Sequence, residues 1–149
     1  MEMDNDSVRA YLGAIAFRFS YLTDGLSDDF ADFSAGHGVR TPLEILRHMS
    51  ELVIFSLSQF KEVDSLNLEQ TDWQSEKARF LGLLKSLDES LSKNAECNAE
   101  LMQPENLWQG PLADTMTHIG QLAMLRRLWG QPLEKINYWK APTFDFSKL

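Results

Sequence analysis

The chain is poor in cysteine and has no long apolar run. Cys97 is the single cysteine among 149 residues, so no disulfide can form within the chain. This usage is typical of a reducing compartment. The acidic start, MEMDNDSVR, lacks the basic and then apolar order of a secretory signal, and no apolar run is long enough to cross a bilayer. We therefore expect a cytoplasmic protein, with Cys97 an unreactive linker residue because its acidic neighbours disfavour a thiolate.

Basic residues are also scarce. The chain has 14 Lys and Arg against 22 Asp and Glu, which gives a formal net charge of −8. Nucleic acids and anionic membranes select basic surfaces, so we expect neither as a partner. Internal repeats, low-complexity tracts and strand-like alternation are missing as well. The length and the hydrophobic content of 44% indicate a single domain over residues 1–149 with one sizeable core.

What the chain does contain is helical periodicity. Apolar residues recur at three- and four-residue spacing in four segments, which predicts an all-α protein built as a four-helix bundle. In the first segment, for example, Val8, Leu12 and Ile15 begin one continuous apolar stripe. The predicted helices cover about residues 6–26, 41–60, 72–93 and 111–127.

Two of these helices have clear boundary signals. Thr41–Glu44 is a capping box, with Thr at the N-cap, Pro at the first helical position and Glu at the third. Pro111 is predicted to open the fourth helix in the same way. Arg126 and Arg127, followed by Gly130, indicate where that helix ends.

Two long segments lie outside the predicted helices. Residues 94 to about 110 form the longest connection, and long connections in compact domains are often functional. The tail after Gly130 is too apolar to be a free segment, so we expect it to pack on the bundle or on another subunit. Its aromatic residues are Tyr138, Trp139, Phe144 and Phe146.

Two of the three histidines fall within predicted helices. His48 lies seven residues after Thr41, and His118 lies eight residues after Gly110. At the rise of an α-helix they are about 10 and 12 Å into their helices. The two imidazoles can therefore meet inside a bundle, whether the helices are parallel or antiparallel. A catalytic metal site needs three protein ligands and an open position, and these histidines supply two.

Helix spacing selects the neighbours of His118. Asp114 and Gln121 share its face, at i−4 and i+3. Both are candidates for a third ligand, and Asp114 could instead orient His118 as a hydrogen-bond partner. We predict a metal site with His48, His118 and Gln121 as ligands.

The helix of His48 offers a proton acceptor. Glu44 and Glu51 lie on the same face of that helix, and Glu76 on the third helix is a more distant candidate ligand. We predict that Asp114 or Glu44 accepts the proton in catalysis. In the competing structural interpretation, each histidine is partly buried and makes a single hydrogen bond.

Three stretches resemble the DinB-like superfamily of metal-dependent four-helix-bundle proteins. GPLADTMTHIGQLAMLRRLWGQPLEKINYWKA resembles the C-terminal part of these proteins, RTPLEILRHMSELV their second helix and DWQSEKARFLGLLKSLDESL their third. The resemblance covers nearly the whole chain in the right order and is most specific in the last helix. It implies an up-down-down-up bundle, often dimeric. It also implies nickel or zinc, held by one histidine of the second helix and an HxxxH pair of the fourth.

His48 and His118 match two of these ligand positions, but Leu122 stands where the third histidine is expected. Some members of the family are transferases or isomerases that use a low-molecular-weight thiol. We predict a thiol transferase or hydrolase that depends on a divalent metal (nickel, zinc or iron) and acts on a small molecule in the His48/His118 pocket. The alternative is a non-catalytic, stress-associated or ligand-binding homodimer that has lost the metal because of Leu122.

Overall fold

The computed structural model describes residues 3–60, 69–93 and 103–149, so Cys97 lies outside the described residues. Within these ranges the chain is helical and contains no strand, which confirms the predicted fold class at the level of an all-helical protein. The α-helices are α1 (Asn5–Thr23), α2 (Pro42–Ser58), α3 (Trp73–Ser92), α4 (Pro104–Leu107) and α5 (Ala113–Leu128). The short elements are the 3-10 helices Asp28–Asp32, Tyr138–Lys140 and Phe146–Lys148 and the π-helical turn Trp108–Leu112.

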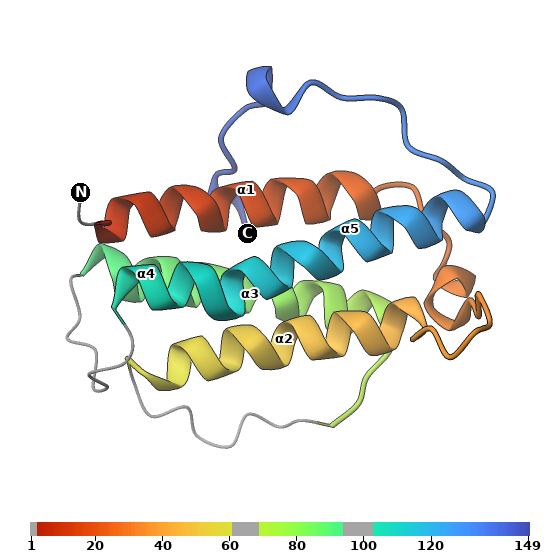
Figure 1. The fold of residues 1–149 in the computed structure, drawn as a ribbon, viewed down its shortest axis with the longest axis horizontal. Coiled ribbons are helices and arrows are strands. Elements are labelled where there is room, and N and C mark those ends of the chain that lie inside the picture. Colours follow the sequence, from red (N-terminus) through yellow and green to blue (C-terminus); the bar gives the residue numbers. More distant parts are fainter. Residues whose placement is uncertain (1–2, 61–68, 94–102) are drawn as a thin grey trace.

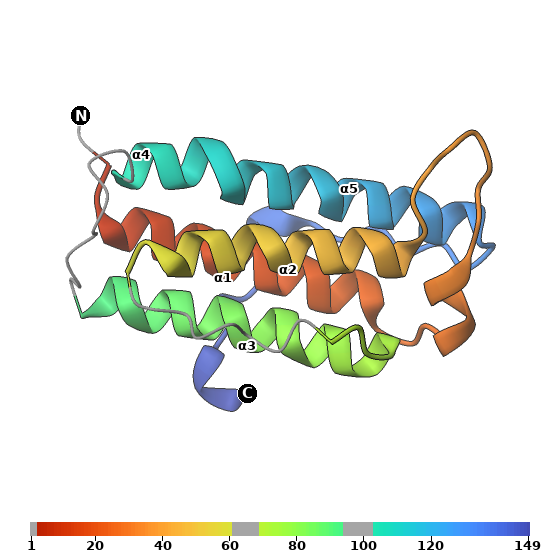
Figure 2. The same ribbon diagram turned by 90° about the horizontal axis from the view of Figure 1, so that it is seen from below.

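The four long helices pack side by side as a bundle (Figures 1 and 2). Going round the bundle, α1 packs against α3, α3 against α2, α2 against α5, and α5 against α1. Helices α1 and α5 run in one direction and α2 and α3 in the other (Figure 1). The helices α2 and α5, which carry the two histidines, are therefore antiparallel neighbours.

Side-chain caps set the beginnings of three helices. Thr41 Oγ1 accepts a hydrogen bond from the Glu44 N–H at 3.3 Å, so α2 starts at Pro42 as the capping box predicts. Asp4 and Asp72 cap α1 and α3 in the same way, each accepting a backbone N–H at 2.8 Å. The pKa of the Asp4 carboxyl group is lowered first by the Ser7 hydroxyl and then by the Ser7 N–H, and that of Asp72 first by the Ser75 N–H. The predicted end of the first helix at Leu26 is three residues too late, because the chain turns at Gly25 with φ of 69°.

The prediction that the fourth helix starts at Pro111 is wrong. The helix begins at Pro104 and continues through the π-helical turn Trp108–Leu112 into α5. Pro111 has no N–H and its ring crowds the preceding turn, which the wider π-helical turn accommodates. Trp108 stacks on Tyr11 with ring centroids 4.1 Å apart, and this contact with α1 holds the early turns in place. Pro111 therefore marks a distortion within a helix and not the start of one.

The core is a single cluster formed by the predicted apolar stripes, with Phe19 and Phe80 packed edge to face at its centre. Arg126 closes one end of the bundle. Its buried guanidinium donates hydrogen bonds at 2.7 Å to the carbonyl groups of Leu22, Asp24 and Gln131. The basic residue predicted to mark the end of the fourth helix thus also ties that end to the end of α1.

The tail returns along α1 (Figure 1). Phe144 and Phe146 are partly buried against the core, and Arg18 lies over the Tyr138 ring at 3.8 Å. Trp139, in contrast, is 95% exposed. None of the helices in the described part of the chain is long and apolar enough to cross a membrane.

Candidate metal centre

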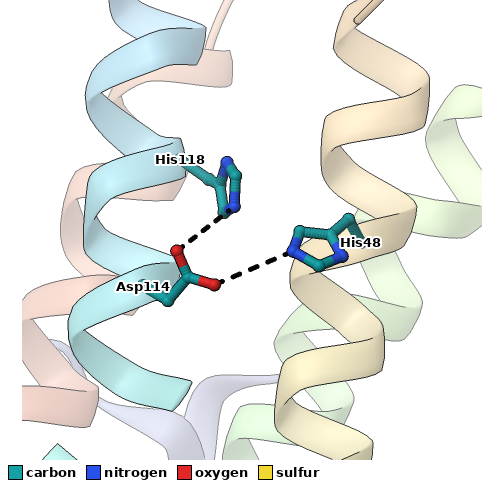
Figure 3. A group of neighbouring side chains, drawn as sticks. All are labelled: His48, Asp114 and His118. Atoms are coloured by element: carbon teal, nitrogen blue, oxygen red, sulfur yellow. Dashed lines mark ion pairs between the residues drawn. The ribbon is translucent and has the colours of Figure 1, made fainter. Parts of the chain in front are cut away.

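His48, Asp114 and His118 converge between α2 and α5 (Figure 3). One potential ligand atom from each residue lies within 4.8 Å of the other two, and no other such group occurs among the residues that the structure describes. The two imidazole rings are 4.8 Å apart between centroids and nearly perpendicular. The prediction that the two histidines meet inside the bundle is therefore confirmed.

Asp114 lies between the two histidines. Its Oδ1 is 3.4 Å from His118 Nε2, and its Oδ2 is 3.8 Å from His48 Nε2 (Figure 3). Asp114 is one turn before His118 on α5, and His48 approaches from the antiparallel α2, so the carboxylate faces both rings. The three residues thus present one carboxylate and two imidazole nitrogens to a common point.

Each histidine has a second acceptor three residues later on its own helix. Gln121 Oε1 lies 2.7 Å from His118 Nδ1, and Glu51 Oε2 lies 3.5 Å from His48 Nδ1. If Gln121 Oε1 accepts at Nδ1, a neutral His118 ring carries its proton there and has its lone pair on Nε2. Glu51 lies on the corresponding side of the His48 ring at ion-pair distance. In both rings it is Nε2 that faces Asp114. Hydrogen-bond partners on the far ring nitrogen are typical of metal-binding histidines.

The arrangement leaves three acceptors facing one another unless a proton or a cation lies between them. Two lone-pair nitrogens and a carboxylate repel each other, whereas a divalent cation attracts all three. Two histidines with one carboxylate form a ligand set used by catalytic zinc and by non-haem iron. Tetrahedral zinc with metal–ligand bonds of about 2.0–2.1 Å separates its ligand atoms by about 3.4 Å. The Asp114 Oδ1–His118 Nε2 distance of 3.4 Å equals this value, and the Asp114 Oδ2–His48 Nε2 distance of 3.8 Å is slightly longer. With one ligand atom taken from each residue the three atoms lie within 4.8 Å of one another, so the donor set suits such an ion, and a bound ion would draw the ligands closer together.

The site is buried on one side and open on the other. The His118 side chain is 11% exposed, the His48 side chain 29% and the Asp114 side chain 48%. Leu122, at the position of the expected third histidine, is fully buried in the core. Solvent therefore reaches the group from the side of Asp114, where a small molecule could approach.

The structure separates the other predicted site residues. Gln121 Oε1 contacts His118 at Nδ1, whereas Asp114 lies at Nε2 of the same ring. Glu44 is exposed on α2, one turn before His48, and is outside the group of three. Glu76 is fully buried and pairs with Arg47 and Arg79 instead.

Glu51 lies at ion-pair distance from His48, a contact that the sequence analysis does not predict. Glu51 and Gln121 each follow a histidine by three residues. This shared i+3 spacing is the signal that could have predicted the contact between Glu51 and His48.

Comparisons with protein-family models, with curated proteins and with solved structures gave no match. The geometry of the site therefore carries the functional argument.

Proposed function

We propose that the protein binds one divalent metal ion through His48, Asp114 and His118 and acts on a small molecule as a metal-dependent hydrolase or thiol-dependent transferase. The observation that carries the proposal is the matched arrangement of the two histidines. Each has an acceptor at Nδ1 and directs Nε2 toward the same carboxylate. Asp114 takes the ligand place that Leu122 leaves empty, and Gln121 and Glu51 orient the rings.

The helix directions support a relationship to the DinB-like superfamily. Up-down-down-up order is the arrangement that the sequence resemblance implies, and α1, α2, α3 and α5 run in that order (Figure 1). Within that relationship, a carboxylate one turn before His118 replaces a histidine one turn after it. The change favours zinc or iron over nickel, because a mixed nitrogen and oxygen site with three ligands suits both ions.

A divalent ion in such a site lowers the pKa of a bound water or thiol and so supplies a nucleophile at neutral pH. The protein residues have two tasks around it. Gln121 and Glu51 hold the imidazole rings in one orientation. Asp114 has two carboxylate oxygens, and the one that is not a ligand can accept the proton of the nucleophile. The half-exposed position of Asp114 leaves the open side of the site to the substrate.

Zinc stoichiometry tests the site. Tag-free protein, stripped with a chelator and then titrated with Zn²⁺ by calorimetry, is expected to bind one ion per chain. His48→Ala and His118→Ala should each abolish this binding, and Asp114→Asn should weaken it by about 10- to 100-fold. The third histidine provides the matched control. His37 lies in an exposed loop with φ of 57°, a backbone conformation that Asn tolerates, so His37→Asn should bind zinc like the wild type.

Two results would overturn the assignment. Folded wild-type protein that takes up no zinc, iron or nickel at excess metal would favour the alternative of a non-catalytic bundle. Loss of zinc binding in His37→Asn to the same degree as in His48→Ala would show that the ion binds elsewhere. Circular dichroism of each variant distinguishes loss of the site from loss of the fold.

The choice between a thiol and water as nucleophile needs a second measurement. Cobalt-loaded protein should develop a sulfur-to-cobalt absorption band in the near ultraviolet when a low-molecular-weight thiol such as glutathione or cysteine is added, if the protein is a transferase. A spectrum that thiols leave unchanged, together with metal-dependent ester hydrolysis, would assign the protein to the hydrolases.

A further inference from the structure

An open groove continues from the histidine site along α5. Its volume is about 750 Å³, within the range of small-molecule sites. His118 and Gln121 line the end next to the candidate metal centre, and Leu128, at the end of α5, lines the other. Ten residues of helix separate His118 from Leu128, which corresponds to about 15 Å. The segment between the 3-10 helix Asp28–Asp32 and α2 lies beside this part of α5 and forms the facing wall (Figure 2).

The groove surface is mostly apolar. Ile45 and Leu125 are buried and form its floor. Val39, Met124 and Leu128 lie at its rim and are 46%, 66% and 61% exposed. Three large apolar side chains exposed around one hollow are unusual on a soluble surface, and methionine adapts readily to ligands of different shape.

The charge of the groove is the opposite of that of the chain. Arg40 is its one permanently charged lining residue, and no lining residue is acidic, although the chain has 22 acidic residues against 14 basic ones. Arg40 is exposed, and no ion pair or hydrogen bond of its guanidinium is present in the described ranges. A guanidinium beside an apolar groove recognises a carboxylate or a similar anionic group.

We infer that the groove binds small amphipathic anions, with the apolar body on Ile45 and Leu125 and the anionic group at Arg40. The inference rests on the proposed function in one respect, since it makes such molecules the substrate class of the metal site. It deepens that function by separating two groups of the substrate. The anionic group is held at Arg40 on the groove rim, and the reacting group lies at the His118 end.

Octanoate and 1-octanol form the test pair, because they share an apolar chain and differ in charge. Their binding to full-length protein is measured by calorimetry in the presence of a chelator, so that the carboxylate cannot bind a metal. Octanoate should bind about fivefold more tightly than octanol, the difference expected for one exposed ion pair. Arg40→Gln should remove this difference and leave octanol binding unchanged. Arg127→Gln, which changes an exposed arginine of α5 outside the groove, is the control and should behave like the wild type.

A second pair of variants tests the apolar wall. Met124→Glu should weaken both ligands at least fivefold, whereas Phe55→Glu should not, because Phe55 is 53% exposed on α2 and does not line the groove. Both positions are exposed, so both variants should keep the fold. Equal effects of the two variants would overturn the assignment of the groove.

The remaining outcomes separate the groove from the metal site. Zinc binding at His48 and His118 without binding of octanoate or octanol at millimolar concentration would overturn the groove and leave the metal site standing. Arg40-dependent octanoate binding by a protein that takes up no metal would support the groove and overturn the metal site. A dimer that Met124→Glu dissociates, in a protein that binds neither ligand, would show that a second copy covers the groove and would overturn the inference.

Discussion

Arg47 and His48 are adjacent in the sequence, yet they belong to two different polar clusters. Arg47 faces α3, where its Nε lies 3.6 Å from a carboxylate oxygen of Glu76. His48 faces α5, where its Nε2 lies 3.8 Å from a carboxylate oxygen of Asp114. Both clusters place one carboxylate between two nitrogen side chains, since Arg79 completes the first and His118 the second.

The difference between the clusters lies in the nitrogen. A guanidinium keeps its proton and offers no lone pair, so Arg47 and Arg79 neutralise Glu76 permanently. The backbone N–H and the hydroxyl of Thr71 also donate to Glu76 at 3.0 Å, and its side chain is fully buried. Neutral imidazoles bring no charge, so Asp114 remains open to a cation. The charges of the first cluster are thus balanced by protein groups, although Arg47 Nε and Glu76 Oε2 make no hydrogen bond. In the second cluster the protein offers no permanent cation beside Asp114.

Removal of one member from each cluster should break this contrast most strongly. Glu76→Ala leaves the partly buried Arg47 and Arg79 without a carboxylate, with only their hydrogen bonds to backbone carbonyl groups, and should lower the free energy of unfolding by about 3 kcal/mol. His48→Ala should change it by less than about 1 kcal/mol in metal-free protein. Urea denaturation under a chelator measures both. Equal losses for the two variants would mean that the histidine cluster also contributes to folding without metal.

Addition of a third imidazole should sharpen the same contrast. Leu122 is fully buried one turn after His118, so Leu122→His places a polar ring in the core and should destabilise the metal-free protein by about 2 kcal/mol. The same ring adds a ligand at the position that the DinB-like family uses, so zinc affinity should rise about tenfold. Calorimetric titration against wild type measures the gain. Unchanged affinity would show that position 122 does not reach the site.

The orienting contacts should have a smaller effect. Gln121→Leu removes the acceptor at His118 Nδ1 and should weaken zinc binding about tenfold, with little change in stability because Gln121 is exposed. Gln131→Leu alters a glutamine after α5, away from the histidines, and serves as the control. A loss in both variants would argue against an orienting role.

The smallest effect concerns a helix cap outside both clusters. Asp72→Ala should lower the melting temperature slightly at pH 7, and this difference should shrink as the pH falls below 3.8. The pKa of Asp72 is lowered in the folded protein by hydrogen bonds from Ser75. Its contribution is therefore present above the unfolded value of 3.8 and is lost as the pH falls through the lower folded value. Asp72→Asn keeps an acceptor without a charge, so its cap should not titrate. Melting curves from pH 2 to 7 provide the comparison.

Local signals in the sequence were sufficient for the features that depend on one helix. The Thr41 capping box located α2 and the depth of His48 within it. For His118 the expected helix start at Pro111 was wrong, because the helix begins at Pro104, so its distance from that start does not explain where it meets His48. Contacts between helices were not accessible in this way. The position of Asp114, rather than Gln121, between the two histidines depends on how α2 and α5 are rotated against each other. The separate pairing of Arg47 depends on α3, for which spacing along α2 gives no information.

The π-helical turn at Trp108–Leu112 acts as a one-residue shift in the register of the last helix. In a regular α-helix each residue advances by about 100°, so deletion of Gly110 would rotate everything before it against everything after it by that amount. Trp108 then could not stay stacked on Tyr11 while Asp114 and His118 stayed opposite His48. Because of the extra residue, one continuous helix can direct its first turns toward α1 and its later turns toward α2.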